Sequence, residues 1–197
     1  MELTDILAVA TKGGASDIHL KVGLPPLFRI DGNLVPLKDV ERLTAEDTQR
    51  MADVAMSPDN REVFGRRHDV DFAYVSPGLG RFRVNVFRQR QYVGMVMRLI
   101  PLKAPTIASL TLPRIVEKIS NEHRGLVLLT GTTGSGKSTT LAAMIEQINN
   151  SRSAHIMTIE DPIEFVFRDK RSLINQREVG VDTPSFSTGL RAAMRQD

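Results

Sequence analysis

The chain has 197 residues, of which 41% are hydrophobic and 25% charged, and its formal net charge is +3 at pH 7. This composition is typical of a soluble globular protein, and the length allows one large domain or two small ones. The absence of cysteine excludes a disulfide framework and a cysteine-ligated zinc site. No signal peptide, membrane span or basic tail is visible. We therefore expect a cytoplasmic protein that neither inserts into a membrane nor binds nucleic acid.

The first hundred residues mix helical and strand patterns. Apolar residues at helical spacing predict helices at residues 2–12 and 44–56. Alternation and β-rich composition predict strands at residues 16–22, 27–37, 70–75, 81–89 and 94–100. Asp31-Gly32 predicts a hairpin turn inside the second of these segments, and Thr44 with Asp47 resembles a capping box. We expect an α+β domain over residues 1–100 with a mostly antiparallel sheet.

The pattern changes after a proline-rich segment. Three prolines within residues 101–113 predict a linker, and the second domain then covers residues 114–197. Helices are predicted at residues 112–121 and 137–148, the latter ending at Asn149-Asn150. Two continuous apolar runs, LVLLT at 126–130 and HIMTI at 155–159, predict parallel strands buried on both faces. Strand, helix and strand form a βαβ unit, so the expected fold class is α/β.

A glycine-rich segment lies between the first apolar run and the following helix. Residues 131–138 are GTTGSGKS, which matches the P-loop pattern G-x-x-x-x-G-K-[ST]. The glycines allow backbone N–H groups to converge on a phosphate, and the helix adds its positive N-terminal end. Lys137 is then expected to reach the β- and γ-phosphates of ATP, and the Ser138 hydroxyl to bind Mg²⁺. The strand before the motif and the helix after it favour nucleotide binding over an ordinary glycine-rich turn.

Three carboxylates follow the second apolar run. Glu160, Asp161 and Glu164 lie in the segment IEDPIEF, where ligands bind in open α/β sheets. Hydrolysis of ATP needs an acid near Mg²⁺ and a group that orients water. These three residues are candidates for both tasks, and a solvated acidic turn is the alternative interpretation.

The segment from Arg81 to Arg98 contains five arginines and no acidic residue. Arginines of this kind can contact a nucleotide phosphate in ATPases. They can also bind nucleic acid, although few aromatic residues are present for base stacking. A polar sheet face is the simplest interpretation, and composition alone favours it.

Five blocks of the sequence, taken in order, resemble the secretion-superfamily ATPases, and among them the retraction ATPases of type IV pili. The blocks are GASDIHL, RFRVNVFRQ, TGTTGSGKSTTLAAMI, HIMTIEDPIEF and NQREVGVDTPSF. The resemblance implies a PAS-like N-terminal domain, a RecA-like C-terminal domain and a hexameric ring that binds ATP and Mg²⁺ between domains and subunits. It also implies that ATP hydrolysis drives pilus retraction for twitching motility. The motor is then expected to work at the inner membrane, where its partner is a platform protein of the pilus machinery.

The resemblance also suggests individual site residues. It assigns the Walker A loop to Gly131, Thr132, Thr133, Gly134, Ser135, Gly136, Lys137, Ser138 and Thr139. It identifies IEDPIE as the family's Asp box, with Glu164 polarising water and Glu160 and Asp161 near the metal. Arg83 and Arg98 are the best matches to the family arginines that contact the phosphates. The resemblance therefore favours a role of these arginines in phosphate binding over the interpretation that they only form a polar sheet face.

Within this superfamily, the lack of cysteine and the start of the chain close to the PAS-like domain favour a retraction motor over an extension motor. An accessory retraction paralogue, a nucleotide-binding scaffold and a small-molecule kinase are the alternatives. In the family, Walker B and a His box follow the last block, and neither lies within these 197 residues. We therefore expect the chain alone to be a poor ATPase, or none.

Overall fold

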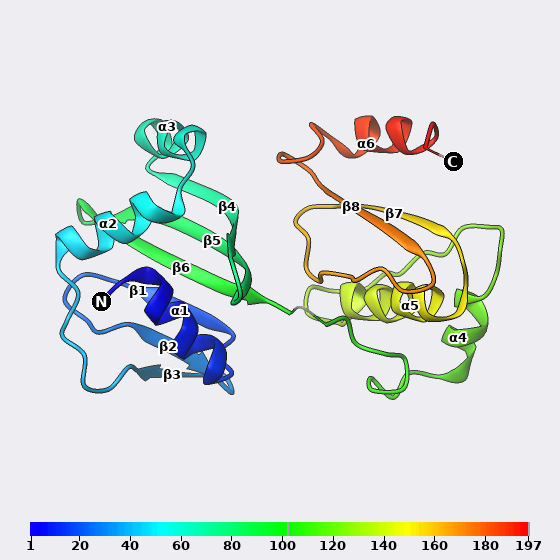
Figure 1. The fold of residues 1–197 in the computed structure, drawn as a ribbon, viewed down its shortest axis with the longest axis horizontal. Coiled ribbons are helices and arrows are strands. Elements are labelled where there is room, and N and C mark those ends of the chain that lie inside the picture. The colour runs from blue at the N-terminus through cyan, green and yellow to red at the C-terminus, as the bar shows by residue number, and fades with distance from the viewer. Residues whose placement is uncertain (102, 197) are drawn as a thin grey trace. The chain divides into compact units, whose positions relative to one another are not determined.

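The computed structural model describes residues 1–101 and 103–196, which form two compact units that divide after Ile100 (Figure 1). The first unit contains three helices, α1 (Leu3–Lys12), α2 (Ala45–Ala55) and α3 (Pro58–Arg67). Its strands are β1 (Asp17–Leu20), β2 (Leu27–Ile30), β3 (Asn33–Pro36), β4 (Asp69–Ser76), β5 (Gly80–Gln89) and β6 (Tyr92–Ile100). The predicted elements of residues 1–100 are confirmed, whereas α3 was not predicted.

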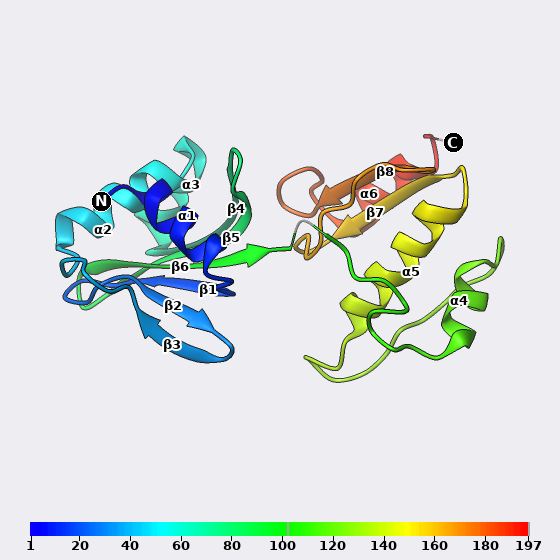
Figure 2. The ribbon, with the colours of Figure 1, turned by 60° about the horizontal axis from the view of Figure 1, so that its bottom comes forward.

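The six strands form one sheet in the order β3-β2-β1-β6-β5-β4, and every neighbouring pair is antiparallel. Figure 2 shows the three helices on one face of this sheet. The strands alternate, so that Phe82, Val84 and Val86 of β5 are fully buried on that face, where they join Ile6 and Leu7 of α1 in one core. Burying side chains of this size stabilises a fold by about 1.5–3 kcal/mol each. The core therefore fixes which strand residues face away from the helices.

Local signals explain where these elements begin and turn. Thr44 caps α2 by accepting a hydrogen bond from the Asp47 amide at 3.1 Å, and the Asp47 carboxylate accepts one from the Thr44 amide at 3.0 Å. Asp31 and Gly32 both have positive φ angles, 47° and 83°, as a two-residue turn between β2 and β3 requires. The predicted capping box and hairpin turn are confirmed.

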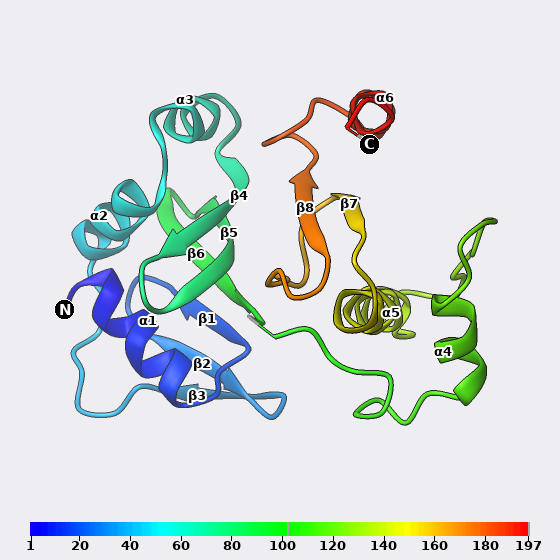
Figure 3. The same ribbon diagram turned by 45° about the vertical axis from the view of Figure 1, so that its right-hand side comes forward.

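The second unit contains helices α4 (Arg114–Ser120), α5 (Lys137–Ser151) and α6 (Phe186–Ala193) and strands β7 (His155–Glu160) and β8 (Leu173–Glu178). The two strands pair in parallel, from His155 opposite Leu173 to Glu160 opposite Glu178. Figures 1 and 3 show α5 and α6 on opposite sides of this pair. Helix α6 packs closely against β7, because a Cβ atom on Gly189 would lie 3.0 Å from Ile159.

The prediction of a buried strand at residues 126–130 is wrong. This segment has no regular structure, and Leu126 and Leu128 are 83% and 74% exposed. A strand needs a neighbour that takes its backbone hydrogen bonds, and no strand in the described part of the chain pairs with it. For the same reason β7 is half-buried along its whole length rather than buried on both faces. The parallel strand that does form beside β7, β8, was not predicted, and neither was α6.

The predicted end of the helix at Asn149-Asn150 is also wrong. Helix α5 continues to Ser151, and the Asn149 side chain is fully buried. Its amide donates to the Arg168 carbonyl at 2.8 Å, and its oxygen accepts from the Lys170 amide at 3.2 Å. Asparagine can occupy a helix interior when such partners satisfy its side chain. Asn149 therefore joins α5 to the segment that leads into β8.

Candidate nucleotide-binding site

The glycine-rich loop requires glycine at three positions. Gly131, Gly134 and Gly136 have φ angles of 151°, 78° and 90°, which other residues rarely adopt. A Cβ atom on Gly131 would also lie only 2.6 Å from Ser135 Oγ. Gly136 is the N-cap of α5, so the loop ends at the N-terminus of a helix of 15 residues. The unpaired N–H groups and the helix dipole at this end favour an anion.

Lys137 is the first residue of α5, and its side chain folds back over the loop. Its Nζ donates to the carbonyl oxygens of Gly131 at 3.0 Å and Thr132 at 2.7 Å. Both hydrogen bonds are solvent-exposed, so phosphate oxygens could replace the carbonyl oxygens at small cost. The ammonium group is thus held on the loop itself.

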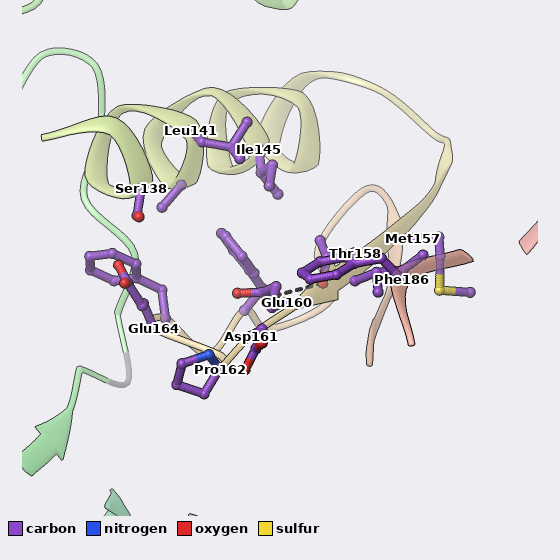
Figure 4. A pocket seen from close by; sticks show the side chains of 14 residues that line it. Ser138, Leu141, Ile145, Met157, Thr158, Glu160, Asp161, Pro162, Glu164 and Phe186 are labelled. Carbon is purple, nitrogen blue, oxygen red and sulfur yellow. Dashed lines mark hydrogen bonds between the residues drawn. The ribbon is translucent and has the colours of Figure 1, made fainter. Parts of the chain in front are cut away.

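A cavity of about 430 Å³ lies beside the start of α5, between this helix and the end of β7 (Figure 4). Ser138 lines it from the helix, and Glu160, Asp161 and Glu164 line it from the segment after β7. The rest of the lining is mainly apolar, with Leu141 and Ile145 on α5 and aromatic side chains opposite. The structure therefore brings together the predicted metal ligand and all three predicted acidic residues.

The three carboxylates differ in their surroundings. Glu160 is half-buried and accepts hydrogen bonds from Thr158 Oγ1 at 2.6 Å and from Gln176 Nε2 at 2.9 Å. Asp161 and Glu164 are exposed. Within the part of the chain that the structure describes, no three acidic or histidine side chains are close enough to hold a metal by themselves. Mg²⁺ fits such a site, because it commonly takes one or two protein ligands together with phosphate oxygens and water.

The two arginines predicted to contact phosphate lie in the first unit, on the face of the sheet away from the helices. Arg83 on β5 is directly opposite Arg98 on β6. Arg98 Nε donates to Asp17 Oδ1 at 2.8 Å, and Arg83 Nε lies 3.9 Å from Asp71 Oδ1. The structure thus places both arginines in ion pairs on a sheet face.

Asp17 is buried, with only 5% of its surface exposed. Burial raises the pKa of this carboxyl, but hydrogen bonds from Ser16 and Arg98 and the charges of Arg98 and Arg29 outweigh burial. The pKa of Asp17 therefore lies below its ordinary value. The carboxylate stays ionised at neutral pH and holds Arg98 through its Nε.

Two further polar residues contact the acidic segment, and neither was predicted as a site residue from the sequence. Gln176 and Glu178 both lie on β8 and hydrogen bond with residues 160–167. Both residues lie in the segment NQREVG, which was singled out only because it resembles the family. Polar residues at alternate positions of a strand were the available signal, but only the pairing of β8 with β7 shows what they contact.

Comparison with known proteins assigns the chain to a family. The family model of type II/IV secretion system proteins matches residues 2–197. The chain belongs to this family. The chain is similar to the type IV pilus retraction ATPase PilT of Pseudomonas aeruginosa, at 47% identity, and to the type IV pilus ATPase PilU of the same organism, at 40% identity. All of the chain is covered in both comparisons, but only 57% of PilT and 51% of PilU.

Two solved structures also resemble the chain along almost its whole length. The crystal structure of the pilus retraction motor PilT with bound ADP superposes with a TM-score of 0.93 at 50% identity, covering 100% of the chain and 57% of that structure. The Legionella pneumophila ATPase DotB gives a TM-score of 0.79 at 28% identity, covering 99% of the chain and 56% of that structure. The chain thus spans a little over half the length of these relatives, and the expected α/β fold class is confirmed.

Proposed function

We propose that the chain binds ATP with Mg²⁺ at residues 131–139 and belongs to a motor subunit whose ATP hydrolysis drives retraction of type IV pili. The observation that carries this proposal is the glycine-dependent loop at the N-terminus of α5, directly beside a cavity that contains Ser138 and three carboxylates. The similarity to PilT supports the choice of motor, because the identity is higher than to PilU, 47% against 40%.

The residues of the loop bind the phosphates in this proposal. The Lys137 ammonium leaves the two carbonyls that now hold it and binds phosphate oxygens, together with the backbone N–H groups of the loop. The Ser138 hydroxyl and the nearby Glu160 and Asp161 provide oxygen ligands of the kind that Mg²⁺ prefers. When bound, Mg²⁺ neutralises charge on the phosphates.

Glu164 orients the attacking water in this proposal. Its carboxylate is exposed and lines the cavity that Ser138 also lines (Figure 4). The carboxylate accepts a hydrogen bond from water, and the water oxygen bonds to the γ-phosphorus. The bond from the γ-phosphorus to the β–γ bridging oxygen breaks, its electron pair stays on the β-phosphate, and one proton of the water passes to an oxygen of the transferred phosphate. The products are ADP and inorganic phosphate. Arg83 and Arg98 contact the phosphates in the assembled motor, and Arg98 then does so while Asp17 holds its Nε.

The proposed assembly is a homo-oligomer, a hexameric ring, in the cytoplasm. It works at the inner membrane through a platform protein of the pilus machinery. None of the helices in residues 1–101 and 103–196 is long and apolar enough to cross a bilayer. Light scattering with and without ATP tests the assembly, since a motor subunit assembles into rings and a small-molecule kinase need not.

Titration of the chain with a fluorescent ATP analogue tests the binding step. We expect saturable binding that strengthens with Mg²⁺ and that weakens about 10- to 100-fold in Lys137→Ala, because a charged hydrogen bond contributes about 1.5–3 kcal/mol. Lys118→Ala, on α4, is the matched control and should bind as the wild type does. Equal affinity in wild type and Lys137→Ala would refute the nucleotide site. Phosphate release from the product of the complete gene then separates a motor from a nucleotide-binding scaffold.

A further inference from the structure

Glu164 lies on a segment with no regular structure, residues 161–167, which we call the acidic loop. An exposed side chain on such a loop needs support if it is to orient water, because a displacement of about 1 Å at a reacting group can cost about 100-fold in rate. The support comes from neighbouring β8. Its residues Gln176 and Glu178 are two positions apart, so their side chains lie on the same face of the strand.

Gln176 makes three hydrogen bonds here, one with Glu160 at the end of β7 and two with the acidic loop. Its Nε2 donates to Glu160 Oε1 at 2.9 Å and to the Phe165 carbonyl at 2.8 Å. Its Oε1 accepts from the Phe167 amide at 2.9 Å. One amide side chain therefore holds the Glu160 carboxylate and the backbone that follows Glu164.

Glu178 holds the other side of the same loop. It is buried, with 4% of its surface exposed, and its Oε2 accepts a hydrogen bond from the Ile163 amide at 3.1 Å. Its own backbone is anchored, since its amide donates to Asp182 Oδ2 at 2.8 Å. Glu164 is thus bracketed, with Ile163 bound on one side and Phe165 on the other.

On the other face of β8, the side chains hydrogen bond elsewhere. Asn175 hydrogen bonds with His155 Nε2 at 2.8 Å, and Arg177 donates to the Asp182 carbonyl at 2.7 Å. These contacts lie outside the cavity lining. Asn175 therefore offers a control of the same chemistry on the same strand.

We propose that Gln176 and Glu178 are positioning residues, which hold the Glu160 carboxylate and the acidic loop so that Glu160 and Glu164 face the bound nucleotide. This inference rests on the proposed function, since it assumes that these carboxylates act on ATP. A glutamine supplies both a donor and an acceptor from one side chain, and it can therefore bind a carboxylate, a carbonyl and an amide together.

Amide hydrogen exchange of the 197-residue chain tests the contacts directly. We expect exchange at the Phe167 amide to rise at least about fivefold in Gln176→Ala, and exchange at the Ile163 amide to rise as much in Glu178→Ala, because each amide loses a hydrogen bond with a net contribution of about 1 kcal/mol or more. Amides within β7 and α5 should change less than about twofold in both variants. Unchanged exchange at Phe167 and Ile163 would overturn the proposal, and so would a general rise, which indicates a role in overall stability.

Steady-state ATPase kinetics of the product of the complete gene test the functional half. In Gln176→Ala, kcat should fall about 10- to 100-fold while KM for ATP changes less than about threefold, the pattern of lost transition-state positioning. Asn175→Ala should match the wild type. Glu178→Gln should keep kcat within about threefold, since its amide oxygen can still accept from Ile163, whereas Glu178→Ala should not.

The outcomes separate the two proposals. If Gln176→Ala keeps the wild-type kcat, or if its KM rises while kcat is unchanged, the positioning inference is wrong and the proposed function stands. If the wild-type protein binds no nucleotide or does not release phosphate, the proposed function is wrong. The role of Gln176 and Glu178 in catalysis is then wrong as well.

Discussion

Replacement of Asn149 by alanine should destabilise the second unit although the residue touches no ligand. Asn149 is fully buried in α5. Its side chain makes two hydrogen bonds across to the backbone of residues 168 and 170, at 2.8 and 3.2 Å, and a third with the buried Glu146 at 3.3 Å. The alanine variant would leave the Arg168 carbonyl and the Lys170 amide without these partners.

The size of the effect follows from these contacts. Two partly buried backbone groups that lose their partners cost about 1.5 kcal/mol each, or about 3 kcal/mol together. Alanine has a higher helix propensity than asparagine, which returns about 0.5 kcal/mol. The expected loss in the free energy of unfolding is therefore about 2.5 kcal/mol, which corresponds to about 70-fold in the unfolding equilibrium.

Hydrogen exchange at the amides of α5 measures this loss for the second unit alone, even if the two units unfold separately. Asn150→Ala is the matched control, because it gains the same helix propensity but lies on the exposed side of α5. The Asn150 side chain contacts the Glu146 carbonyl at 2.6 Å and Lys170 Nζ at 2.8 Å. Because Asn150 is exposed, water can replace these contacts, and exchange should change by less than about threefold. If Asn149→Ala accelerates exchange by less than about fivefold, or no more than Asn150→Ala, the burial argument is refuted.

Two further predictions concern Asp17 and the glycine-rich loop. Because the pKa of Asp17 is lowered in the folded state, its contribution to stability is complete above the unfolded pKa of about 3.9 and is lost as the pH falls below it. Urea unfolding of the first unit should thus show a smaller loss of stability between pH 7 and pH 3 in Asp17→Asn than in the wild type. Gly131→Ala should weaken binding of the ATP analogue at least about tenfold, since alanine at a φ of 151° is strained.

Each of these two predictions has a control variant and an outcome that would contradict it. Glu41→Gln changes an exposed carboxylate of the same unit, and this variant should lose as much stability between pH 7 and pH 3 as the wild type does. If Asp17→Asn also loses as much stability between pH 7 and pH 3 as the wild type, the Asp17 carboxylate does not stabilise the first unit through its contacts with the arginines. Gly180→Ala also places alanine at a positive φ, 85°, but lies outside the glycine-rich loop. Equal losses of binding in the two glycine variants would show that strain alone, not loop shape, weakens binding.

The parts of the fold that were predicted correctly depend on short-range patterns. Apolar spacing defined α1 and α2, alternation defined the strands of the first unit, and Asp31-Gly32 defined a turn. The apolar run at 126–130 shows the limit of such patterns. Its composition is that of a buried strand, yet a strand exists only where another strand pairs with it, and Leu126 and Leu128 are exposed instead.

The sequence by itself determined the glycine-rich loop, because a turn of this kind before a helix depends on backbone angles that glycine alone adopts easily. It also indicated which carboxylates follow the next strand. Only the tertiary structure decided which side chains support them. Gln176 meets Glu160 across 16 residues and Arg98 meets Asp17 across 81. Contacts between residues so far apart depend on how strands pair, and no local pattern of a single sequence encodes that pairing.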